Sequence, residues 1–209
     1  MAKLISTSSR AGSGPTREHI AEACLQLIRR SGPEAVTMRH LAATMDVSAT
    51  ELYRHFTCKA DILASVQAQG VDELERWLAD DDEAAPRPER LHRTCLRYIE
   101  LAQTQPWLYS VIFSSADLEL RDAAISVFTT AVRQALDPPP GAVPSEDTRP
   151  LQVWVAMHGL AATLVDRTAS NDPGGHEFGS TFAQRYVSMV IEGLVESPSP
   201  ASVARAAAG

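Results

Sequence analysis

The chain has 209 residues, of which 44% are hydrophobic and 22% charged, so it is long enough to bury a sizeable core. Its net charge of −7 is unevenly spread: residues 1–66 hold 8 Lys and Arg against 6 Asp and Glu, whereas residues 67–209 hold 11 against 20. No apolar run reaches the roughly 20 residues of a membrane span, and the three cysteines lack metal-binding spacing. These features exclude a membrane span and a disulfide scaffold, and they predict a cytoplasmic chain with free thiols.

Residues 1–15 are rich in Ser and Gly and carry Lys3 and Arg10, so we expect a flexible arm that either touches a polyanion or has no role. A helix follows, because five apolar residues recur with helical spacing: Ile20, Ala23, Cys24, Leu27 and Ile28. Two basic residues, then Gly32 and Pro33, end this helix.

Residues 37–59, TMRHLAATMDVSATELYRHFTCK, predict two short helices joined by a tight turn. The first is indicated by four apolar residues at positions i, i+3, i+4 and i+7 of one face: Met38, Leu41, Ala42 and Met45. Asp46 then interrupts the pattern, and Asp tolerates the left-handed conformation of a turn better than most residues. Two helices joined in this way form the unit with which helix-turn-helix proteins bind DNA.

The second helix of this unit is predicted to begin at about Ala49, because Ser48 and Glu51 have the spacing of a capping box. Leu52 and Phe56 are four residues apart and are expected to face the core. The opposite, solvent-facing side then holds Ala49, Thr50, Tyr53 and Arg54. Glu51 could accept from a cytosine amino group, but a capping role explains it more simply.

Positions 16–63 contain a set of residues in a characteristic order along the chain: Thr16-Arg17-Glu18, Gly32, Thr37, Leu41-Ala42, Val47-Ser48, Leu52-Tyr53-Arg54-His55-Phe56, Lys59 and Leu63. It resembles the DNA-binding domain of the TetR-like (tetracycline-repressor) family of transcriptional regulators. Two positions depart from the family pattern. Asp46 replaces the usual turn glycine, and residues 49–51 lack the basic residue usual near the start of the recognition helix, so a strong Arg or Lys contact with guanine is absent there.

The resemblance implies the residues that contact the DNA backbone. Tyr53 and His55 lie at positions that bind phosphates in the family, Lys59 begins the following helix near the backbone, and Thr37 begins the first helix of the motif. Cys58 precedes Lys59 beside this surface, so its oxidation could switch binding, although a tolerated surface thiol is the simpler interpretation.

Base-edge contacts are expected from Ser48, Ala49 and Thr50, because Thr can meet either a polar base edge or a thymine methyl group. Arg39 and Arg54 are either phosphate partners or ordinary surface charges. Both alternatives stay open at the level of the sequence.

The rest of the chain predicts further helices. A long helix from Lys59 to about Leu78 runs into the acidic stretch Asp80-Asp81-Asp82-Glu83, which we expect to be a solvated loop. The remaining helices are expected over residues 91–104, 107–113, 117–136, 151–168 and 178–196, with a Pro-rich loop at 137–150 and a turn at 171–175. No segment shows sustained period-two alternation, so the predicted fold class is all-α.

The helix predicted at residues 151–168 is apolar nearly all round, so a second partner must cover the side that its own domain leaves open. A second copy of the chain is the economical partner. The family resemblance agrees, because the last two helices of TetR-like C-terminal domains form a four-helix dimer interface. Small residues would permit close helix approach: Gly159, Ala161 and Ala162.

Large aromatic and thioether side chains are expected to fill the interior of the second domain. In the resembled family, a cavity among these helices binds a small, mainly apolar effector, and its entry moves the long helix that begins at Lys59. The resemblance therefore implies effector contacts from Trp107, Phe113, Phe128, Trp154, Met157, His158 and Phe182. His158 alone has two interpretations, since it is either a ligand-binding or catalytic group or a satisfied core or interface residue.

These features predict a homodimeric all-α transcriptional regulator, a repressor that binds a near-palindromic double-stranded DNA operator and is released by the effector. The expected domains are an arm at 1–15, the DNA-binding domain at 16–62, an effector-binding and dimerisation domain at 63–197, and a tail at 198–209. An enzyme that uses His158 with Asp166 is disfavoured, because there is no nucleophile motif, metal cluster or phosphate loop, and no cofactor is expected. A helical interaction protein that has lost specific DNA binding remains the alternative.

Overall fold

The computed structural model describes residues 14–79, 84–113, 118–136, 147–169 and 175–196. Within these ranges it contains nine α-helices and one short 3-10 helix, and no strand, so the prediction of an all-α fold is confirmed. Most of the expected arm, the acidic stretch, most of the Pro-rich loop, the turn near residue 171 and the tail lie outside the described residues. None of the described helices has the length and apolar character needed to cross a bilayer.

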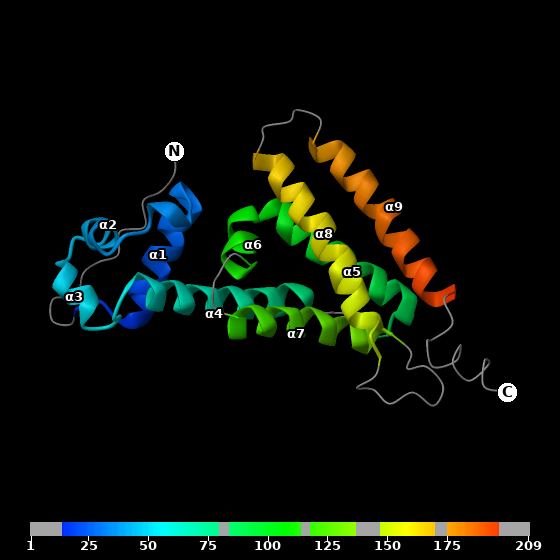
Figure 1. Cartoon of the computed structure of the whole chain (residues 1–209), viewed down its shortest axis with the longest axis horizontal. Helices are drawn as coiled ribbons and strands as arrows, with labels where there is room; N and C mark the ends of the chain where they lie inside the picture. Colours follow the sequence, from blue (N-terminus) through cyan, green and yellow to red (C-terminus); the bar gives the residue numbers. More distant parts are fainter. Residues whose placement is uncertain (1–13, 80–83, 114–117, 137–146, 170–174, 197–209) are drawn as a thin grey trace. The chain divides into compact units, whose positions relative to one another are not determined.

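The chain divides into two compact units, Met1–Val66 and Gln67–Gly209. The described helices of the first unit are α1 (Arg17–Ser31), α2 (Met38–Thr44) and α3 (Ala49–Tyr53), with the 3-10 helix Pro33–Ala35 between α1 and α2. The division falls within α4 (Lys59–Leu78). Figure 1 shows α2 and α3 beside each other as a short helical pair.

A small apolar core holds the first unit together. The fully or almost fully buried side chains of this core come from every helix of the unit and from the segments between them: Ile20, Ala21, Cys24, Leu27, Ile28, Val36, Leu41, Ala42, Leu52, Phe56 and Ile62. Phe56 lies beyond the end of α3, which is shorter than predicted, yet its ring is only 1% exposed. The apolar pattern of the sequence therefore marks burial correctly even where the helix has already ended.

The caps and the turn follow the predicted chemistry. The Thr16 and Thr37 hydroxyl oxygens accept hydrogen bonds from backbone N–H groups three residues on, at the first turns of α1 and α2. Asp46 has a φ of 55°, the only positive φ at a non-glycine residue in the described chain. The residue that replaces the family's turn glycine thus adopts the left-handed conformation, which is less favourable for Asp than for Gly.

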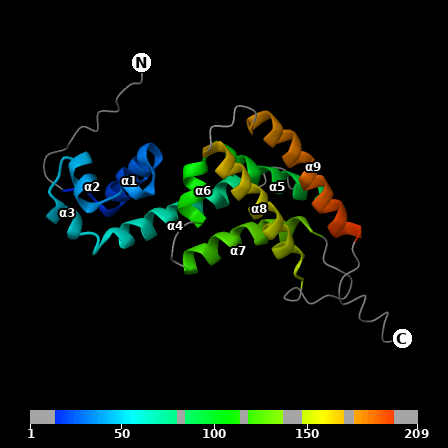
Figure 2. The same cartoon turned by 45° about the horizontal axis from the view of Figure 1, so that its top comes forward.

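The second unit contains the rest of α4 with α5 (Arg87–Thr104), α6 (Pro106–Phe113), α7 (Leu118–Ala135), α8 (Arg149–Ala169) and α9 (Gly175–Glu196). Helix α5 contacts each of the four helices that follow it, and α8 runs antiparallel beside α9 (Figures 1 and 2). Four helices begin one to four residues earlier than expected, and in three of them a proline lies in the first turn: Pro88, Pro106 and Pro150. Proline fits there, since the first N–H groups of a helix have no partner within it.

Helices α4 and α6 approach each other closely at Gly70. A Cβ atom at this position would lie 3.0 Å from Ile112 Cγ1 and 3.3 Å from Leu108 Cδ1. One turn earlier, the buried Gln67 donates from Nε2 to the backbone carbonyl of Ile112 at 2.8 Å. This bond satisfies one of the last carbonyls of α6, which have no partner within the helix.

Candidate nucleic-acid interface

Helix α3 has one buried and one exposed face. Leu52 is fully buried, whereas Thr50, Tyr53 and Arg54 are exposed, with 55% of Tyr53 accessible to solvent. Ala49 is half-buried at the first position of the helix. The helix therefore presents a short, mostly uncharged polar surface.

The N-terminus of α3 forms half of the predicted capping box. Ser48 Oγ accepts from the Glu51 backbone N–H at 3.2 Å. The Glu51 carboxylate binds Arg54 Nη1, at 3.1 and 3.0 Å from its two oxygens, where the capping box expects it to bind the Ser48 N–H. An exposed pair three residues apart contributes little to stability, but it neutralises the cation on the exposed face of α3.

Helix α2 places two more of the expected residues at the surface. Thr37 Oγ1 accepts from the His40 N–H at 3.1 Å, and its hydroxyl proton is still available for an acceptor on another molecule. Arg39 is exposed on the first turn of α2. Both residues are therefore accessible, as a contact with DNA requires.

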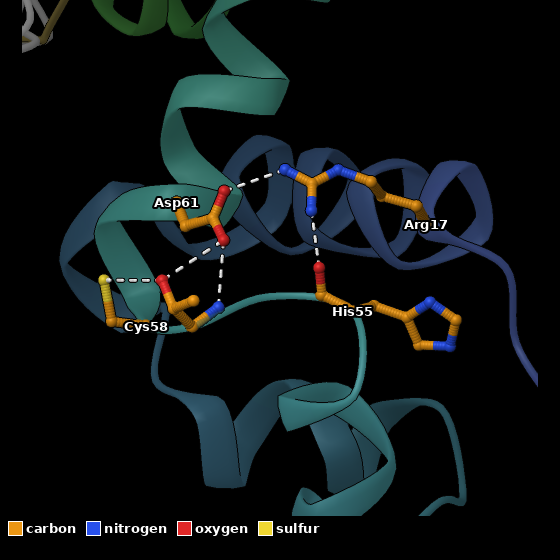
Figure 3. Close-up of polar contacts among 5 residues, drawn as sticks. Arg17, His55, Cys58 and Asp61 are labelled. Atoms are coloured by element: carbon orange, nitrogen blue, oxygen red, sulfur yellow. Dashed lines mark hydrogen bonds and ion pairs between the residues drawn. The ribbon is translucent and has the colours of Figure 1, made fainter.

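The connection from α3 to α4 is held by a hydrogen-bonded network (Figure 3). Arg17 donates from Nη1 to the backbone carbonyl of His55 and from Nη2 to Asp61 Oδ1, the latter at 2.8 Å. The second carboxylate oxygen of Asp61 accepts from the Thr57 backbone N–H at 2.9 Å. The His55 ring points away from the guanidinium group, so the network fixes its backbone and leaves its imidazole outside.

The network also controls the ionisation of Asp61. The backbone N–H of Thr57 and then the guanidinium group of Arg17 lower the pKa of Asp61 below its ordinary value. Asp61 is therefore charged at neutral pH. It lies in the first turn of α4, where a negative charge interacts favourably with the helix dipole.

Cys58 and Lys59 lie at the start of α4. The exposed Cys58 has a lowered pKa, because the Asp61 N–H, the Thr57 hydroxyl and the Ala60 N–H all stabilise the thiolate. Lys59 Nζ donates to the backbone carbonyl of Pro33 at 3.3 Å. The Lys59 ammonium group thus already has a partner within the first unit.

The nine residues expected to bind DNA all lie in the first unit, on α2, α3 and the connection to α4: Thr37, Arg39, Ser48, Ala49, Thr50, Tyr53, Arg54, His55 and Lys59. Sequence reasoning missed Asp61 and assigned no role to Arg17. Both carried a signal, because Arg17 follows an N-cap threonine and Asp61 is an acidic residue in the first turn of a helix.

In the second unit, an aromatic cluster surrounds His158. The Tyr98 and Tyr109 hydroxyl groups lie 3.0 and 2.9 Å from His158 Nδ1. The Trp154 ring stacks on the imidazole with centroids 4.7 Å apart, and Phe113 meets it edge-on at the same distance. Burial, followed by the positive charge of Arg121, lowers the pKa of His158, so the imidazole is neutral at pH 7.

The residues expected to bind an effector are only partly gathered around this cluster. Phe113, Trp154 and His158 belong to it, and the buried Phe128 packs against Tyr98 with ring centroids 4.7 Å apart. Met157 is fully buried and Trp107 packs against the same core. Phe182 stacks on Tyr186 in α9 and is 43% exposed.

Tyr98 and Tyr109 complete the cluster, and sequence reasoning missed both. The signal was available, since a tyrosine on an apolar helix must find a partner for its hydroxyl. A hollow of about 380 Å³ lies elsewhere in the unit, between α4, α5 and α7, and none of the seven expected effector residues lines it. No group of three metal-binding side chains is found among the described residues.

Residues 20–66 match the family model described as bacterial regulatory proteins, tetR family. The match is confined to the N-terminal unit. The match covers the core of the first unit, the two helices of the motif and Asp61 at the start of α4, whereas Arg17 lies before the matched residues. TetR-family regulators are DNA-binding proteins and not enzymes. No curated protein sequence matches the chain.

The fold of the whole chain is also that of TetR-family regulators. It is similar to a TetR variant from Acinetobacter baumannii AYE in complex with minocycline, with 16% identity, a TM-score of 0.64, and coverage of 88% of this chain and 100% of that chain. It is also similar to FadR from Bacillus subtilis in complex with stearoyl-CoA, with 18% identity, a TM-score of 0.62, and coverage of 83% of this chain and 97% of that chain. A third similar structure is BioQ with its double-stranded DNA operator, with 19% identity, a TM-score of 0.56, and coverage of 85% of this chain and 99% of that chain.

Proposed function

We propose that this protein is a TetR-family transcriptional repressor that binds a near-palindromic operator as a homodimer and is released by a small, mainly apolar effector. The observation that carries the DNA-binding part is the exposed face of α3, presented by a capped N-terminus within a domain that matches the family model. Of the similar structures, BioQ is a complex with its DNA operator. The remaining observations support the individual parts of the proposal.

The proposed DNA contacts divide into two classes. Tyr53, His55 and Thr37 contact phosphates and set the position of the domain, and Lys59 lies next to the backbone. Ser48, Ala49 and Thr50 face base edges, and they supply the sequence preference. Ser48 supports this assignment, because its hydroxyl accepts from the Glu51 N–H and keeps a proton to donate.

The charge of the first unit limits its electrostatic attraction to DNA. Residues 1–66 carry a net charge of +2, and the guanidinium groups of Arg17 and Arg54 are paired with Asp61 and Glu51. Arg39 remains as an exposed candidate for a phosphate contact. The acidic second unit, with a net charge of −9, repels the polyanion and favours contact through the first unit.

The proposed dimer interface is formed by α8 and α9. Large apolar side chains are exposed on both helices: Leu151, Val155, Phe182 and Met189. Gly159 continues the exposed row of Leu151 and Val155 at four-residue spacing, and nothing lies within 4 Å of where its Cβ would be. Ala161, which we expected to assist close helix approach, is instead fully buried within its own unit. The exposed row needs a second apolar surface to cover it.

The proposed effector site lies at the aromatic cluster around His158. The cluster is mainly aromatic, and its hydroxyl and imidazole groups would fix the orientation of a ligand. The similar FadR and TetR structures hold stearoyl-CoA and minocycline. An effector acts as proposed if it binds the DNA-free conformation more tightly than the DNA-bound one, and its effect on DNA affinity cannot exceed that difference.

The test is selection of bound duplexes from a randomised pool by the full chain, followed by measurement of affinity for the enriched sequence at several salt concentrations. We expect an inverted repeat whose half-sites are about 34 Å or somewhat more apart, with an affinity that falls as salt rises. Failure of a folded dimer to enrich any sequence would contradict the proposal. It would favour the alternative, a helical interaction protein, which the paired Arg54 and the absence of a cation at residues 49–51 also support.

A further inference from the structure

We infer that Arg17 and Asp61 form a positioning pair that fixes the connection between α3 and α4 for DNA binding, and that Arg17 is not itself a phosphate ligand. This inference rests on the proposed DNA-binding function. It concerns two residues outside the set of nine assigned to DNA contact. Figure 3 shows the pair between the start of α1 and the start of α4.

Arg17 uses its guanidinium group in three ways at once. Nη2 is 2.8 Å from Asp61 Oδ1, Nη1 donates to the carbonyl of His55, and the central carbon lies 4.0 Å above the Phe56 ring. The three partners come from the residues after α3 and from the first turn of α4. A planar fork with fixed donor directions is suited to holding such points together, whereas a lysine ammonium group is not.

Asp61 connects Arg17 to the backbone before α4. Its second oxygen accepts from the Thr57 N–H at 2.9 Å and lies 3.3 Å from the Thr57 hydroxyl. Arg17 therefore acts on Thr57 without touching it. His55 and Thr57 bracket Phe56, whose buried ring anchors the segment, so both sides of the anchor are restrained by the pair.

Removing the charge of Arg17 or of Asp61 distinguishes a positioning role of Arg17 from direct contact with a phosphate. If Arg17 bound a phosphate directly, its removal would lower the salt dependence of binding by about one charge, and neutralising Asp61 would strengthen binding because a negative charge disappears. If the pair positions the connection, neutralising Asp61 weakens binding despite the favourable change in charge. The two hypotheses thus predict opposite effects for one substitution.

The first experiment needs no DNA and measures backbone amide hydrogen exchange in the full chain. We expect Arg17→Ala to speed exchange at the Thr57 amide by about tenfold or more, because the loss of a charge-assisted bond frees the Asp61 carboxylate. The Met45 amide, which donates to Leu41 within the same unit, should keep its rate. Arg17→Lys should give an intermediate rate, and it serves as the second variant if Arg17→Ala does not fold. An unchanged Thr57 rate in both variants would overturn the inference.

The second experiment measures affinity for a duplex selected by the unmodified protein. We expect Arg17→Ala and Asp61→Asn each to weaken binding by about tenfold, and the double variant to be no weaker than either single one, because the two residues act as one unit. Glu34→Gln removes the same charge from an exposed position of the same unit and should bind at least as tightly as the unmodified protein. The salt dependence of Arg17→Ala should equal that of the unmodified protein.

The outcomes are distinguishable. Asp61→Asn binding as tightly as Glu34→Gln, with Arg17→Ala losing one charge of salt dependence, would make Arg17 a phosphate ligand and overturn the inference. If the unmodified protein selects no duplex, the proposed function fails, while the hydrogen-exchange experiment still decides whether the pair orders the connection.

Discussion

Tyr109 contacts His158 at two points, because its hydroxyl oxygen lies 2.9 Å from Nδ1 and 3.3 Å from the backbone carbonyl oxygen of the same residue. A hydroxyl has one proton. When that proton goes to the carbonyl, Nδ1 can still accept from Tyr98, whose hydroxyl is 3.0 Å away. The arrangement fits a neutral imidazole with its proton on Nε2.

The neutral state of His158 should make stability depend on pH. Because burial and Arg121 lower its pKa in the folded protein, the unfolded chain takes up the proton first, near the ordinary pKa of about 6.5. The contribution to stability is complete above that pH and is lost as the pH falls below it. Urea unfolding should therefore show a smaller loss of stability between about pH 6.5 and 5 for His158→Gln than for the unmodified protein. The exposed control His19→Gln should keep the original pH dependence, and equal slopes for all three proteins would contradict the prediction.

The three cysteines should differ sharply in reactivity. Cys58 is exposed and has a lowered pKa, whereas burial raises the pKa of Cys24 to about 11 and that of Cys95 to about 12. Because the thiolate is the nucleophile, we expect iodoacetamide to modify Cys58 first and the other two only after unfolding. Mass spectrometry of peptides taken during the reaction measures the order. Early modification of Cys95 would show that the interior of the second unit opens readily.

A charge placed on the exposed row of α8 should disrupt the proposed dimer. Val155 is 58% exposed, and Val155→Glu would bury a carboxylate against an apolar surface of the second protomer. We expect the variant to sediment as a monomer at micromolar concentration. Leu118→Glu is the matched control, since Leu118 is 59% exposed on α7. A dimer that survives Val155→Glu but dissociates with Leu118→Glu would move the interface to α7.

The cost of a substitution at Asp46 should depend on how easily the new residue adopts a positive φ. Asp46→Val should lower the free energy of unfolding by about 1–2 kcal/mol, because a β-branched residue is strained at a φ of 55°. Asp46→Gly should change it by less than about 0.5 kcal/mol, because relief of the positive φ is offset by the greater freedom of glycine in the unfolded chain. Denaturant unfolding measures both. Ala43→Val, at an exposed position of α2, controls for the cost of a β-branched side chain.

Thr50 and Tyr53 should affect DNA binding in different ways. Tyr53→Ala should weaken binding about equally for all sequences, because a phosphate contact carries no sequence information. Thr50→Ala should relax the preference at one base position by about 1–3 kcal/mol. Affinities for the selected duplex and for its single-base variants separate the two effects. Thr130→Ala, exposed on α7, is the control, and normal binding by Tyr53→Ala would refute the assignment of Tyr53.

Local chemistry explains why the helical fold could be predicted. The spacing of Leu41 and Ala42 and the hydroxyl of Ser48 are signals within one or two turns, and the structure has a helix and a cap at these positions. The left-handed Asp46 followed from the same kind of reasoning. Helix starts were less accurate: α5, α6, α8 and α9 begin one to four residues before the expected position, and in the first three a proline lies in the first turn.

Contacts between distant residues could not be predicted in the same way. Arg17 and Asp61 are 44 residues apart, and Tyr98 and His158 are 60 apart. No periodicity links such pairs, since only packing of the helices brings them together. Glu51 illustrates the same limit at short range: its spacing from Ser48 predicted a reciprocal cap, but the carboxylate binds Arg54.

The single exposed thiol provides a natural site for a spin label. Cys58 lies at the start of α4, and the other two cysteines are buried. A nitroxide attached there would mark each protomer of a dimer once, without any engineered cysteine. The distance between two such labels, read from their dipolar coupling, would report the separation of the two DNA-binding units in solution, and its change on adding a ligand would be measured on the natural sequence.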